Sequence, residues 1–357
     1  MSGLSKIENI KMLLKKISLQ DFRNYQKKTF NFSSGVNLVV GPNTLGKTNL
    51  LEAIYLLSSG DSFRARKIEE MITYDRQVAH IDGMAEIDRE DLKLSVVLTR
   101  GIIEGKRVPL RQFFLSNVKK SKISFIGNFL AVIFRPEDLE IVIDSPAIRR
   151  DFLDEVLNQA DREYYRAHLS YRKGLRSRNK ILENIRERRA SIKALFFWDR
   201  LLVENGELIT KKREEFIDFL NNQEDAFGKL GVFYQKNLVS LKRLEEKRNI
   251  EIAAAMTLVG PHRDDFWVSG NNRNLSIYGS RGEQRLAVLW LRLGQLEFLR
   301  RARNKQPVLL LDDIFSELDS RNRRIIFGVM GDNQVIITST SKFSLLAKKA
   351  NIIELGS

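Results

Sequence analysis

One eight-residue run, residues 41–48, constrains this chain more than any other feature. It reads GPNTLGKT and fits the pattern G-x-x-x-x-G-K-[ST] at every position. A short apolar run at 36–40 precedes it, and apolar residues at helical spacing follow between 50 and 57. A strand that turns tightly onto a helix presents backbone N–H groups to a phosphate at the helix N-terminus. The run therefore predicts a nucleoside triphosphate site rather than a glycine-rich turn with an incidental lysine.

The residue types in the loop indicate separate roles. Gly46 lets the backbone approach a phosphate closely, Lys47 reaches the β- and γ-phosphates, and the hydroxyl of Thr48 ligates Mg²⁺. Asn43 either positions water or structures the loop. We expect the following residues to contact ATP: Gly41, Pro42, Asn43, Thr44, Leu45, Gly46, Lys47, Thr48 and Asn49.

A second candidate element of the same site is an apolar run at 308–311 that ends in two acids, Asp312 and Asp313. A carboxylate at the tip of a buried strand can hold magnesium beside the Thr48 hydroxyl. The next carboxylate can orient or deprotonate the attacking water. We assign Asp312 to the metal and Asp313 to the water, since the phosphate loop makes an ordinary polar turn the poorer explanation.

Composition excludes several classes of protein. The 357 residues include 60 Lys and Arg against 45 Asp and Glu, a formal charge of +15, and no cysteine. Disulfides, thiolate metal sites and cysteine nucleophiles are thereby excluded, and a reducing, cytoplasmic location fits. No apolar run is long enough to span a bilayer, and the N-terminus lacks the apolar core of a signal peptide. The charge favours an anionic partner, although a highly soluble protein without one is the alternative.

Proline spacing divides the chain. Residues 147–260 contain no proline, and their apolar residues recur at helical spacing. We expect a helical block over about 147–254, broken near Gly174, Gly206 and residues 228–231. One helix face within it would hold Ile148, Phe152, Val156, Leu157, Ala160, Tyr164 and Ala167.

Strand-like runs flank this block at 36–40, 308–311 and 335–337. Strands separated by helices indicate a mainly parallel sheet with helices on its faces. The predicted architecture is therefore an α/β ATPase head split by a mostly helical domain. We expect an N-terminal head part over 1–130, a helical domain over 131–254, and a C-terminal head part over 255–357.

Upstream of the acidic strand, Ser280, Gly282 and Gln284 form an S-x-G-x-Q pattern, and S-x-x-D follows that strand at 316–319. Together with the phosphate loop, this order resembles the ATP-binding-cassette ATPases, most closely the SMC-like branch that acts on DNA. The resemblance implies an ATPase head of that fold. It also implies that ATP is sandwiched between two heads, with Ser280 and Gly282 completing the site of a second subunit.

Further segments resemble one group in this branch, the bacterial RecF family, over essentially the whole chain from about residue 13. The sequence carries FRNY at 22–25, SFR at 62–64, RPEDL at 135–139, RRDFLD at 149–154 and GPHRDD at 260–265. The resemblance implies roles in recombinational repair and replication restart, with RecO and RecR as partners in loading RecA. Arg23 and Arg64 either touch nucleotide, as basic residues do near this point in related heads, or pair with acids.

Several residues depart from the family pattern. Thr44 and Asp144 each stand where the family usually has glycine. Asp313 replaces the glutamate of most cassette ATPases, which suggests slow hydrolysis. Thr340 stands where many of these ATPases have histidine. A hydroxyl there can hydrogen-bond the γ-phosphate but cannot carry a proton as imidazole does.

Two segments hold most of the excess charge. Residues 93–122 contain eight basic residues against one acid, and residues 172–193 contain nine against two. Contacts to phosphates need cations on a common surface, and aromatic residues for single-strand stacking are sparse in both segments. We therefore favour the backbone of duplex DNA or a duplex junction as the partner, with solvated surface as the alternative.

The leading hypothesis is an ATPase whose ATP-induced homodimer clamps DNA and whose slow, DNA-stimulated hydrolysis releases it. Lys47, Asp312, Asp313 and Thr340 would perform the chemistry, and Arg23 and Gln284 would join the ATP contacts. Three alternatives are a dimeric module in which ATP is only structural glue, another SMC-like DNA-processing ATPase, and the ATPase subunit of a membrane transporter. The DNA-type motifs and the basic segments argue against the transporter.

Overall fold

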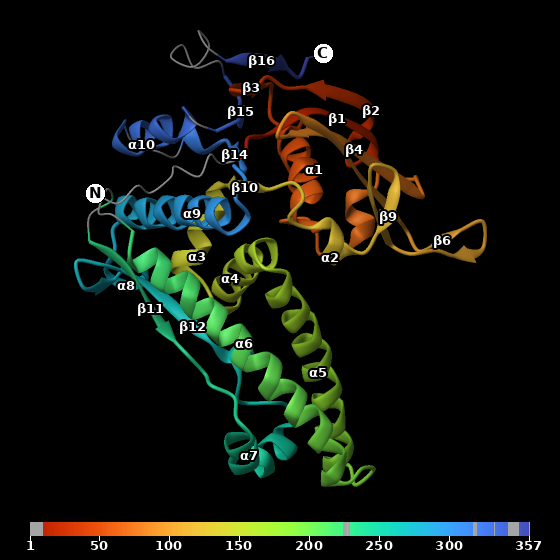
Figure 1. The fold of residues 1–357 in the computed structure, drawn as a ribbon, viewed down its shortest axis with the longest axis vertical. Coiled ribbons are helices and arrows are strands. Elements are labelled where there is room, and N and C mark those ends of the chain that lie inside the picture. Colours follow the sequence, from red (N-terminus) through yellow and green to blue (C-terminus); the bar gives the residue numbers. More distant parts are fainter. Residues whose placement is uncertain are drawn as a thin grey trace. The chain divides into compact units, whose positions relative to one another are not determined.

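The computed structural model describes residues 10–223, 227, 229–316, 320–331, 333–341 and 350–356, shown in Figure 1. The chain divides into two compact units, each with its own internal contacts. Unit 1 comprises Met1–Asp138 and Gln295–Ser357, and unit 2 comprises Leu139–Gly294. Within the described residues, no helix is both long enough and apolar enough to cross a membrane.

In unit 1, a five-stranded sheet includes the strands that lead into the phosphate loop and the two acids of the predicted nucleotide site. Its strand order is β10-β14-β15-β3-β16, and every neighbouring pair is parallel. The strands are β10 (Ala131–Phe134), β14 (Val308–Asp312), β15 (Val335–Ser339), β3 (Val36–Val40) and β16 (Asn351–Glu354). The three runs predicted as strands are confirmed. Because the strands are parallel, their carboxyl ends lie at one edge of the sheet, where ligands bind in open α/β sheets.

Unit 1 also contains a six-stranded antiparallel sheet, which was not predicted from the sequence. Its order is β2-β1-β4-β5-β8-β9. The strands are β1 (Met12–Phe22), β2 (Tyr25–Asn31), β4 (Val78–Ile87), β5 (Glu90–Thr99), β8 (Arg111–Leu115) and β9 (Val118–Lys120). A small hairpin of β6 (Ile102–Ile103) and β7 (Lys106–Arg107) extends from it.

Helix α1 (Lys47–Ser59) joins the two sheets of unit 1. It contacts β10, β14 and β15 of the parallel sheet and β4 and β5 of the antiparallel sheet. Eleven of its thirteen residues are buried, because both sides of the helix are covered. A helix that is apolar nearly all round is the expected sequence for such a position. The remaining helical segments are η1 (Ile68–Met71), α2 (Lys122–Phe125), η2 (Pro136–Leu139), η5 (Ile314–Ser316) and α10 (Ser320–Met330).

Unit 2 is mostly helical, as predicted, and includes one small antiparallel sheet of order β11-β12-β13. Its elements are α3 (Glu140–Ile143), α4 (Pro146–Ala160), α5 (Arg162–Arg186), η3 (Ile192–Leu195), α6 (Phe196–Asn221), β11 (Leu230–Gln235), α7 (Leu241–Ala254), η4 (Pro261–Arg263), β12 (Asp265–Gly270), β13 (Arg273–Asn274) and α8 (Leu275–Tyr278). Helix α9 (Arg281–Arg303) begins in unit 2 and ends in unit 1.

Two predicted helix breaks are wrong. Helix α5 runs through Gly174 and α6 runs through Gly206 without interruption. These glycines instead allow close packing. A Cβ on Gly174 would lie 2.4 Å from Cδ2 of Leu201 on α6, and one on Gly206 would lie 2.5 Å from Cγ1 of Val239. The two helices accordingly pack side by side along the hairpin that they form (Figure 1).

The predicted single helix face from Ile148 to Ala167 is divided between two helices. Helix α4 ends at Ala160, and Asp161 starts α5 by accepting hydrogen bonds from the N–H groups of Glu163 and Tyr164. An aspartate is a strong N-cap, so the new helix begins at that residue.

The domain boundaries also differ from those drawn from the sequence, at 130/131 and 254/255. Strand β10 pairs with β14 and so belongs to unit 1. Residues 255–294 belong to unit 2, where β12 pairs with β11. Pairing between strands distant in the chain, rather than composition, sets both boundaries.

Candidate nucleotide site

The phosphate loop joins β3 to α1, as its sequence predicts. Gly46 has φ +95°, and a Cβ there would lie 2.5 Å from Oδ1 of Asn24. The hydroxyl of Tyr25 donates a 3.0 Å hydrogen bond to the carbonyl of Gly46. The turn between β1 and β2 thus holds the loop, and only glycine fits at residue 46. Thr44 has φ +83°, so this residue adopts a backbone conformation that is usual for glycine and uncommon for other residues.

Lys47 lies folded across the loop. Its ammonium donates to the carbonyls of Gly41 at 2.7 Å and Pro42 at 2.9 Å, with Oδ1 of Asn43 at 3.5 Å. The side chain is buried. A cation held by neutral carbonyls keeps its full charge for an incoming phosphate.

The first magnesium candidate, Thr48, meets the second, Asp312. The Thr48 hydroxyl donates a 3.1 Å hydrogen bond to Oδ1 of Asp312, and Thr338 donates to the same oxygen at 2.6 Å. Thr338 also accepts the backbone N–H of Asp313 at 3.0 Å. Thr338 was not predicted from the sequence; the signal that identifies it is the parallel register, which places it opposite Asp312.

Burial raises the pKa of Asp312, although the hydrogen bonds from Thr338 and Thr48 partly offset that effect. Glu137 raises the pKa further through its charge, and Arg135 lowers it. Among the described residues, no lysine or arginine lies within ion-pair distance of this carboxylate. A buried carboxylate beside a threonine hydroxyl fits Mg²⁺, which binds one or two carboxylates together with phosphate oxygens and water.

Two further predicted residues follow the carboxyl ends of neighbouring strands. Asp313 follows β14 with φ +49°, which turns the chain sharply after Asp312. Thr340 follows β15 and is exposed. Both lie beyond the edge of the sheet at which the phosphate loop begins. Residues 317–319 of the S-x-x-D pattern lie outside the described residues.

Arg23 pairs with an acid that the sequence analysis did not single out, Glu52 of α1. Its Nε and Nη2 donate to the two carboxylate oxygens at 2.8 and 2.6 Å. Arg64 and Ser62 also donate to Glu52, which is fully buried. Burial alone would raise the pKa of Glu52, but the hydrogen bonds from Arg23 and Ser62 and the charge of Arg64 lower it overall. Arg23 therefore anchors the helix that follows the phosphate loop.

A cavity of about 680 Å³ lies beside these residues. Asn49 donates to Oδ1 of Asn24 at 2.7 Å and accepts from Arg64. The lining residues are Arg23, Asn24, Asn49, Arg64, Glu69, Glu70, Ile72, Tyr74 and Arg100. Its arginines and the exposed ring of Tyr74 suit an anionic, aromatic ligand.

The S-x-G-x-Q pattern lies in unit 2 at the start of α9. The backbone N–H of Ser280 donates to Oε2 of Glu283 at 2.8 Å, and the Ser280 hydroxyl accepts the Glu283 N–H at 3.3 Å, which is a capping box. Gln284 is buried and donates to the carbonyl of Leu275 at 2.9 Å, so within this chain it holds α8 against α9. Ser280 and Gly282 are exposed. A Cβ on Gly282 would meet only Oγ of Ser280, at 4.0 Å, so packing within the chain does not require glycine there.

A protein-family model described as the RecF/RecN/SMC N terminal domain matches residues 13–354. The chain belongs to the RecF/RecN/SMC family. Within it, the chain is 36% identical over 351 residues to the DNA replication and repair protein RecF of Caldanaerobacter subterraneus subsp. tengcongensis, covering 93% of this chain and 95% of the relative. It is also 36% identical over 346 residues to the RecF protein of Clostridium botulinum strain Alaska E43, covering 92% and 93%.

Solved structures place the chain in the RecF branch of this family. A structure described as the recombination mediator protein RecF-ATPrS in the RecFOR pathway has a TM-score of 0.86 and 34% identity, and the match covers 94% of both chains. A second one, described as RecF-ATP, has a TM-score of 0.86 and 33% identity, covering 96% and 95%. The expected α/β ATPase head of the SMC-like branch is confirmed.

The RecF-type chain carries its two basic segments on separate units. Residues 93–122 lie in unit 1 along β5 to β9, where Lys106, Arg107, Lys119 and Lys120 are exposed. In the same segment, Arg111 and Lys122 both pair with Asp61. Their charge is therefore partly neutralised.

Residues 172–193 lie in unit 2, on α5 and the connection to α6. Arg178 is fully buried and pairs with Asp199 and Glu251, each at 2.7 Å, so it cannot contact DNA. Arg189 pairs with Glu187, whereas Arg186 and Arg188 are exposed. The segment also exposes Arg172, Lys173, Arg176, Lys180 and Lys193, so its surface charge extends along α5 and the connection to α6.

Proposed function

We propose that this chain is an ATP-dependent DNA-binding protein of recombinational repair and replication restart. The observation that carries the proposal is the convergence of Lys47, Thr48 and Asp312 at one edge of the parallel sheet. Relatives named as DNA replication and repair proteins, and a solved structure described as RecF-ATP, support it.

The nucleotide chemistry follows from the residues at that edge. Thr48 and Asp312 would hold Mg²⁺, which supplies charge neutralisation on the phosphates. Lys47 would exchange its carbonyl partners for phosphate oxygens, because a charge-assisted hydrogen bond is the stronger one. Asp313 orients the attacking water, and Thr340 donates a hydrogen bond toward the γ-phosphate. The shorter reach of an aspartate compared with a glutamate makes hydrolysis slow.

The cavity beside the loop accommodates the rest of the nucleotide. Arg64 and Tyr74 offer a cation and a ring to the sugar and base. Arg23 acts mainly through Glu52, since three of its nitrogens donate to Glu52 and the carbonyl of Glu70. Its contribution to ATP binding is to fix α1, rather than direct contact.

ATP joins two copies of the chain in this proposal. The exposed Ser280 and Gly282 of one copy bind the nucleotide held by the phosphate loop of the other. Gln284 supports this surface by its hydrogen bond to the carbonyl of Leu275, which holds α8 against α9. The resulting homodimer closes on duplex or gapped DNA, which DNA-stimulated hydrolysis then releases.

The cations available for DNA are the exposed ones in both basic segments. They suit the backbone of a duplex or of a single-strand/double-strand junction, because phosphate contacts need no base-reading residue. RecR and RecO are the proposed partners in loading RecA, in the cytoplasm.

The test of this function is a pair of variants. Lys47→Ala should abolish ATP binding, ATP-dependent dimerisation and DNA binding together. Asp313→Asn should preserve ATP binding and dimerisation but slow hydrolysis, so that DNA release is delayed. If Asp313→Asn leaves repair in cells and DNA release unchanged, ATP acts only as structural glue between two copies. If Lys47→Ala still binds DNA as the unmodified chain does with ATP, the proposal fails.

A further inference from the structure

Two sequence motifs that the nucleotide site does not use meet in unit 2. They are RRDFLD at 149–154 and GPHRDD at 260–265. Arg149 binds the carboxylate of Asp265 through Nε at 2.6 Å and Nη2 at 3.0 Å. The adjacent Arg150 donates instead to the backbone carbonyl of Asp264, at 2.8 Å. One arginine of the pair is therefore neutralised by a carboxylate, and the other is not.

A buried network behind these contacts fixes the second motif. Arg213 donates to Asp264 at 2.9 Å and to Asp154 at 2.7 Å. Asp264 is fully buried and also accepts the N–H of Asn237 at 2.7 Å. Buried charges that are paired and hydrogen-bonded in this way hold their neighbours in one arrangement. Any ligand of the adjacent side chains meets a preformed surface.

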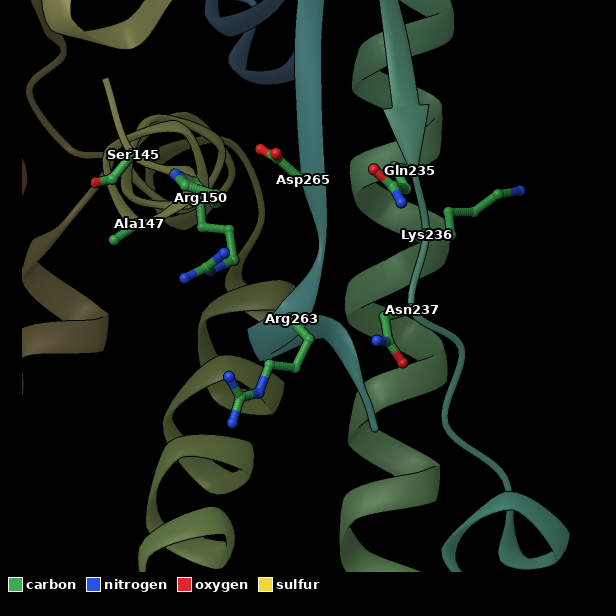
Figure 2. A pocket seen from close by; sticks show the side chains of 9 residues that line it. Ser145, Ala147, Arg150, Gln235, Lys236, Asn237, Arg263 and Asp265 are labelled. Atoms are coloured by element: carbon green, nitrogen blue, oxygen red, sulfur yellow. The ribbon is translucent and has the colours of Figure 1, made fainter. Parts of the chain in front are cut away.

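A pocket of about 450 Å³ opens beside this network. Figure 2 shows its lining side chains. They belong to Ser145, Pro146, Ala147, Arg150, Gln235, Lys236, Asn237, Arg263 and Asp265. Lys236 points away from the pocket in Figure 2 and pairs with Glu214. Asp265 is neutralised by Arg149.

The net charge of the pocket therefore comes from Arg150 and Arg263. Among the described residues, neither guanidinium has a carboxylate within ion-pair distance. The hydrogen bonds of Arg263 are long, 3.5 Å to Sδ of Met256 and 3.5 Å to the carbonyl of Thr257. Both side chains can turn their remaining N–H groups toward a ligand.

Electrostatics at Arg150 also favour an anion. Burial lowers the pKa of Arg150, and the charge of Arg213 lowers it further, while Asp265, Asp151 and Asp154 raise it. A guanidinium whose charged form is disfavoured by burial gains from an anion that binds directly beside it. Ser145 adds a hydroxyl, because its side chain makes no capping hydrogen bond at the start of α4.

We infer that this pocket binds a phosphate group between Arg150 and Arg263, with Ser145 and Asn237 as further donors. Two guanidinium forks match the several oxygens of a phosphate better than the two oxygens of a carboxylate. The group can come from a DNA strand, in which case the inference rests on the proposed DNA-binding function, or from a free phosphate compound.

The experiment compares Arg150→Gln and Arg263→Gln with Lys247→Gln, which removes one exposed positive charge outside the pocket. All variants are saturated with a non-hydrolysable ATP analogue, so that the phosphate loop is occupied. One measurement is the affinity for labelled duplex DNA at several NaCl concentrations. The other is the melting temperature with increasing inorganic phosphate. Because Arg263 makes only long hydrogen bonds, Arg263→Gln keeps the test valid even if Arg150→Gln fails to fold.

If DNA is the source, each arginine variant should lose about tenfold in affinity and reduce the salt slope by about one, while Lys247→Gln does not. If a free phosphate compound is the source, phosphate should raise the melting temperature of the unmodified chain and of Lys247→Gln but of neither arginine variant. A wild-type chain that responds to phosphate but never binds DNA would refute the proposed function and retain this site. Arginine variants that match Lys247→Gln in both measurements would overturn the inference.

Discussion

The hydroxyl of Thr48 donates a 3.1 Å hydrogen bond to Oδ1 of Asp312, although 264 positions separate the two residues in the chain. Thr48 is the last residue of the phosphate loop and lies in the first turn of α1, and Asp312 ends β14. The parallel sheet brings them together because β3 and β14 point the same way, with β15 between them. In the proposed function, this relationship joins two separate sequence motifs into one site for magnesium.

Thr338 supports that site without being part of either motif. Thr338→Val keeps the shape of the side chain but removes the hydrogen bonds to Asp312 and from Asp313. We expect the affinity for Mg²⁺ in the presence of ATP to fall about 10- to 100-fold. Stability should fall by about 1–2 kcal/mol, since the Asp313 N–H loses its partner. Metal titration of ATPase activity and denaturant unfolding measure the two effects.

The matched control is Thr210→Val in α6. Its hydroxyl is buried and has no hydrogen-bond partner among the described residues. Thr210→Val should leave the metal titration unchanged and should not destabilise the chain. Equal Mg²⁺ affinity in Thr338→Val and Thr210→Val would show that Thr338 does not contribute to metal binding.

A substitution at Gly282 should impair ATP-dependent dimerisation without impairing folding. Because no described residue crowds a Cβ there, Gly282→Ala should fold normally and gain up to about 1 kcal/mol of helix stability. The added methyl should nevertheless obstruct the surface that meets the ATP of a second copy. We expect ATP-dependent dimerisation, measured by light scattering, and ATPase activity to fall together.

Gly328→Ala on α10 is the control for that variant, since a Cβ on Gly328 meets no described residue within 4 Å. It should stabilise the chain without affecting dimerisation. Full activity in Gly282→Ala would argue against a nucleotide site completed by the second copy.

Substituting Arg178 should lower stability without changing DNA affinity, and substituting the arginines near the end of the α5–α6 hairpin should do the reverse. Arg178→Met leaves the buried carboxylates of Asp199 and Glu251 without their cation, so stability should fall by about 3–5 kcal/mol. DNA affinity per folded molecule should stay the same.

Charge reversal at Arg186, Arg188 and Arg189 should instead preserve the melting temperature, weaken DNA binding and flatten its salt dependence.

Unchanged DNA affinity after that charge reversal would indicate that residues 93–122 form the DNA-binding surface instead. A loss of affinity in the folded fraction of Arg178→Met would contradict its structural role. Calorimetry and anisotropy on the same samples separate the two outcomes.

How far the sequence predicted the structure depended on whether the signal was local. The phosphate loop, three strands of the parallel sheet and the acid-tipped strand were all predicted, because each lies within one short segment. The antiparallel sheet was missed. Its tight turns place Asp88, Arg89, Ser116 and Asn117 at positive φ, without the glycine that normally marks such hairpins.

The site residues that were missed depend on tertiary contacts. Nothing near Thr338 in the sequence indicates that it lies opposite Asp312, because only the strand register sets that position. Glu52 reads as one polar residue in an apolar helix, and its role appears only when Arg23 and Arg64 reach it. Likewise, glycines that sequence rules treat as helix breaks, such as Gly174, allow two helices to pack closely.

His262 gives the fold a defined sensitivity to acid. Its Nδ1 accepts from the hydroxyl of Tyr171 at 2.8 Å, and its Nε2–H donates to the carbonyl of Thr257 at 3.0 Å, an arrangement that requires the neutral ring. Burial lowers its pKa from 6.5 to about 4. Between these values the unfolded chain binds more protons than the folded one, so stability falls as the pH is lowered from about 6.5 toward 4.

His262→Gln preserves a donor and an acceptor but does not titrate. The stability lost between pH 7 and pH 5 should be smaller in this variant by about 2 kcal/mol. Urea unfolding at the two pH values measures the difference. An identical loss in both proteins would show that His262 is not the group responsible.

The proposed function requires that ATP is hydrolysed in a site that two copies of the chain complete together. The most direct measurement is the ATPase rate per molecule over protein concentrations from well below to well above micromolar, with and without duplex DNA. We expect the specific activity to rise with protein concentration until the dimer saturates, and to rise further with DNA. A specific activity that is constant throughout, and unchanged by DNA, would contradict the proposed function.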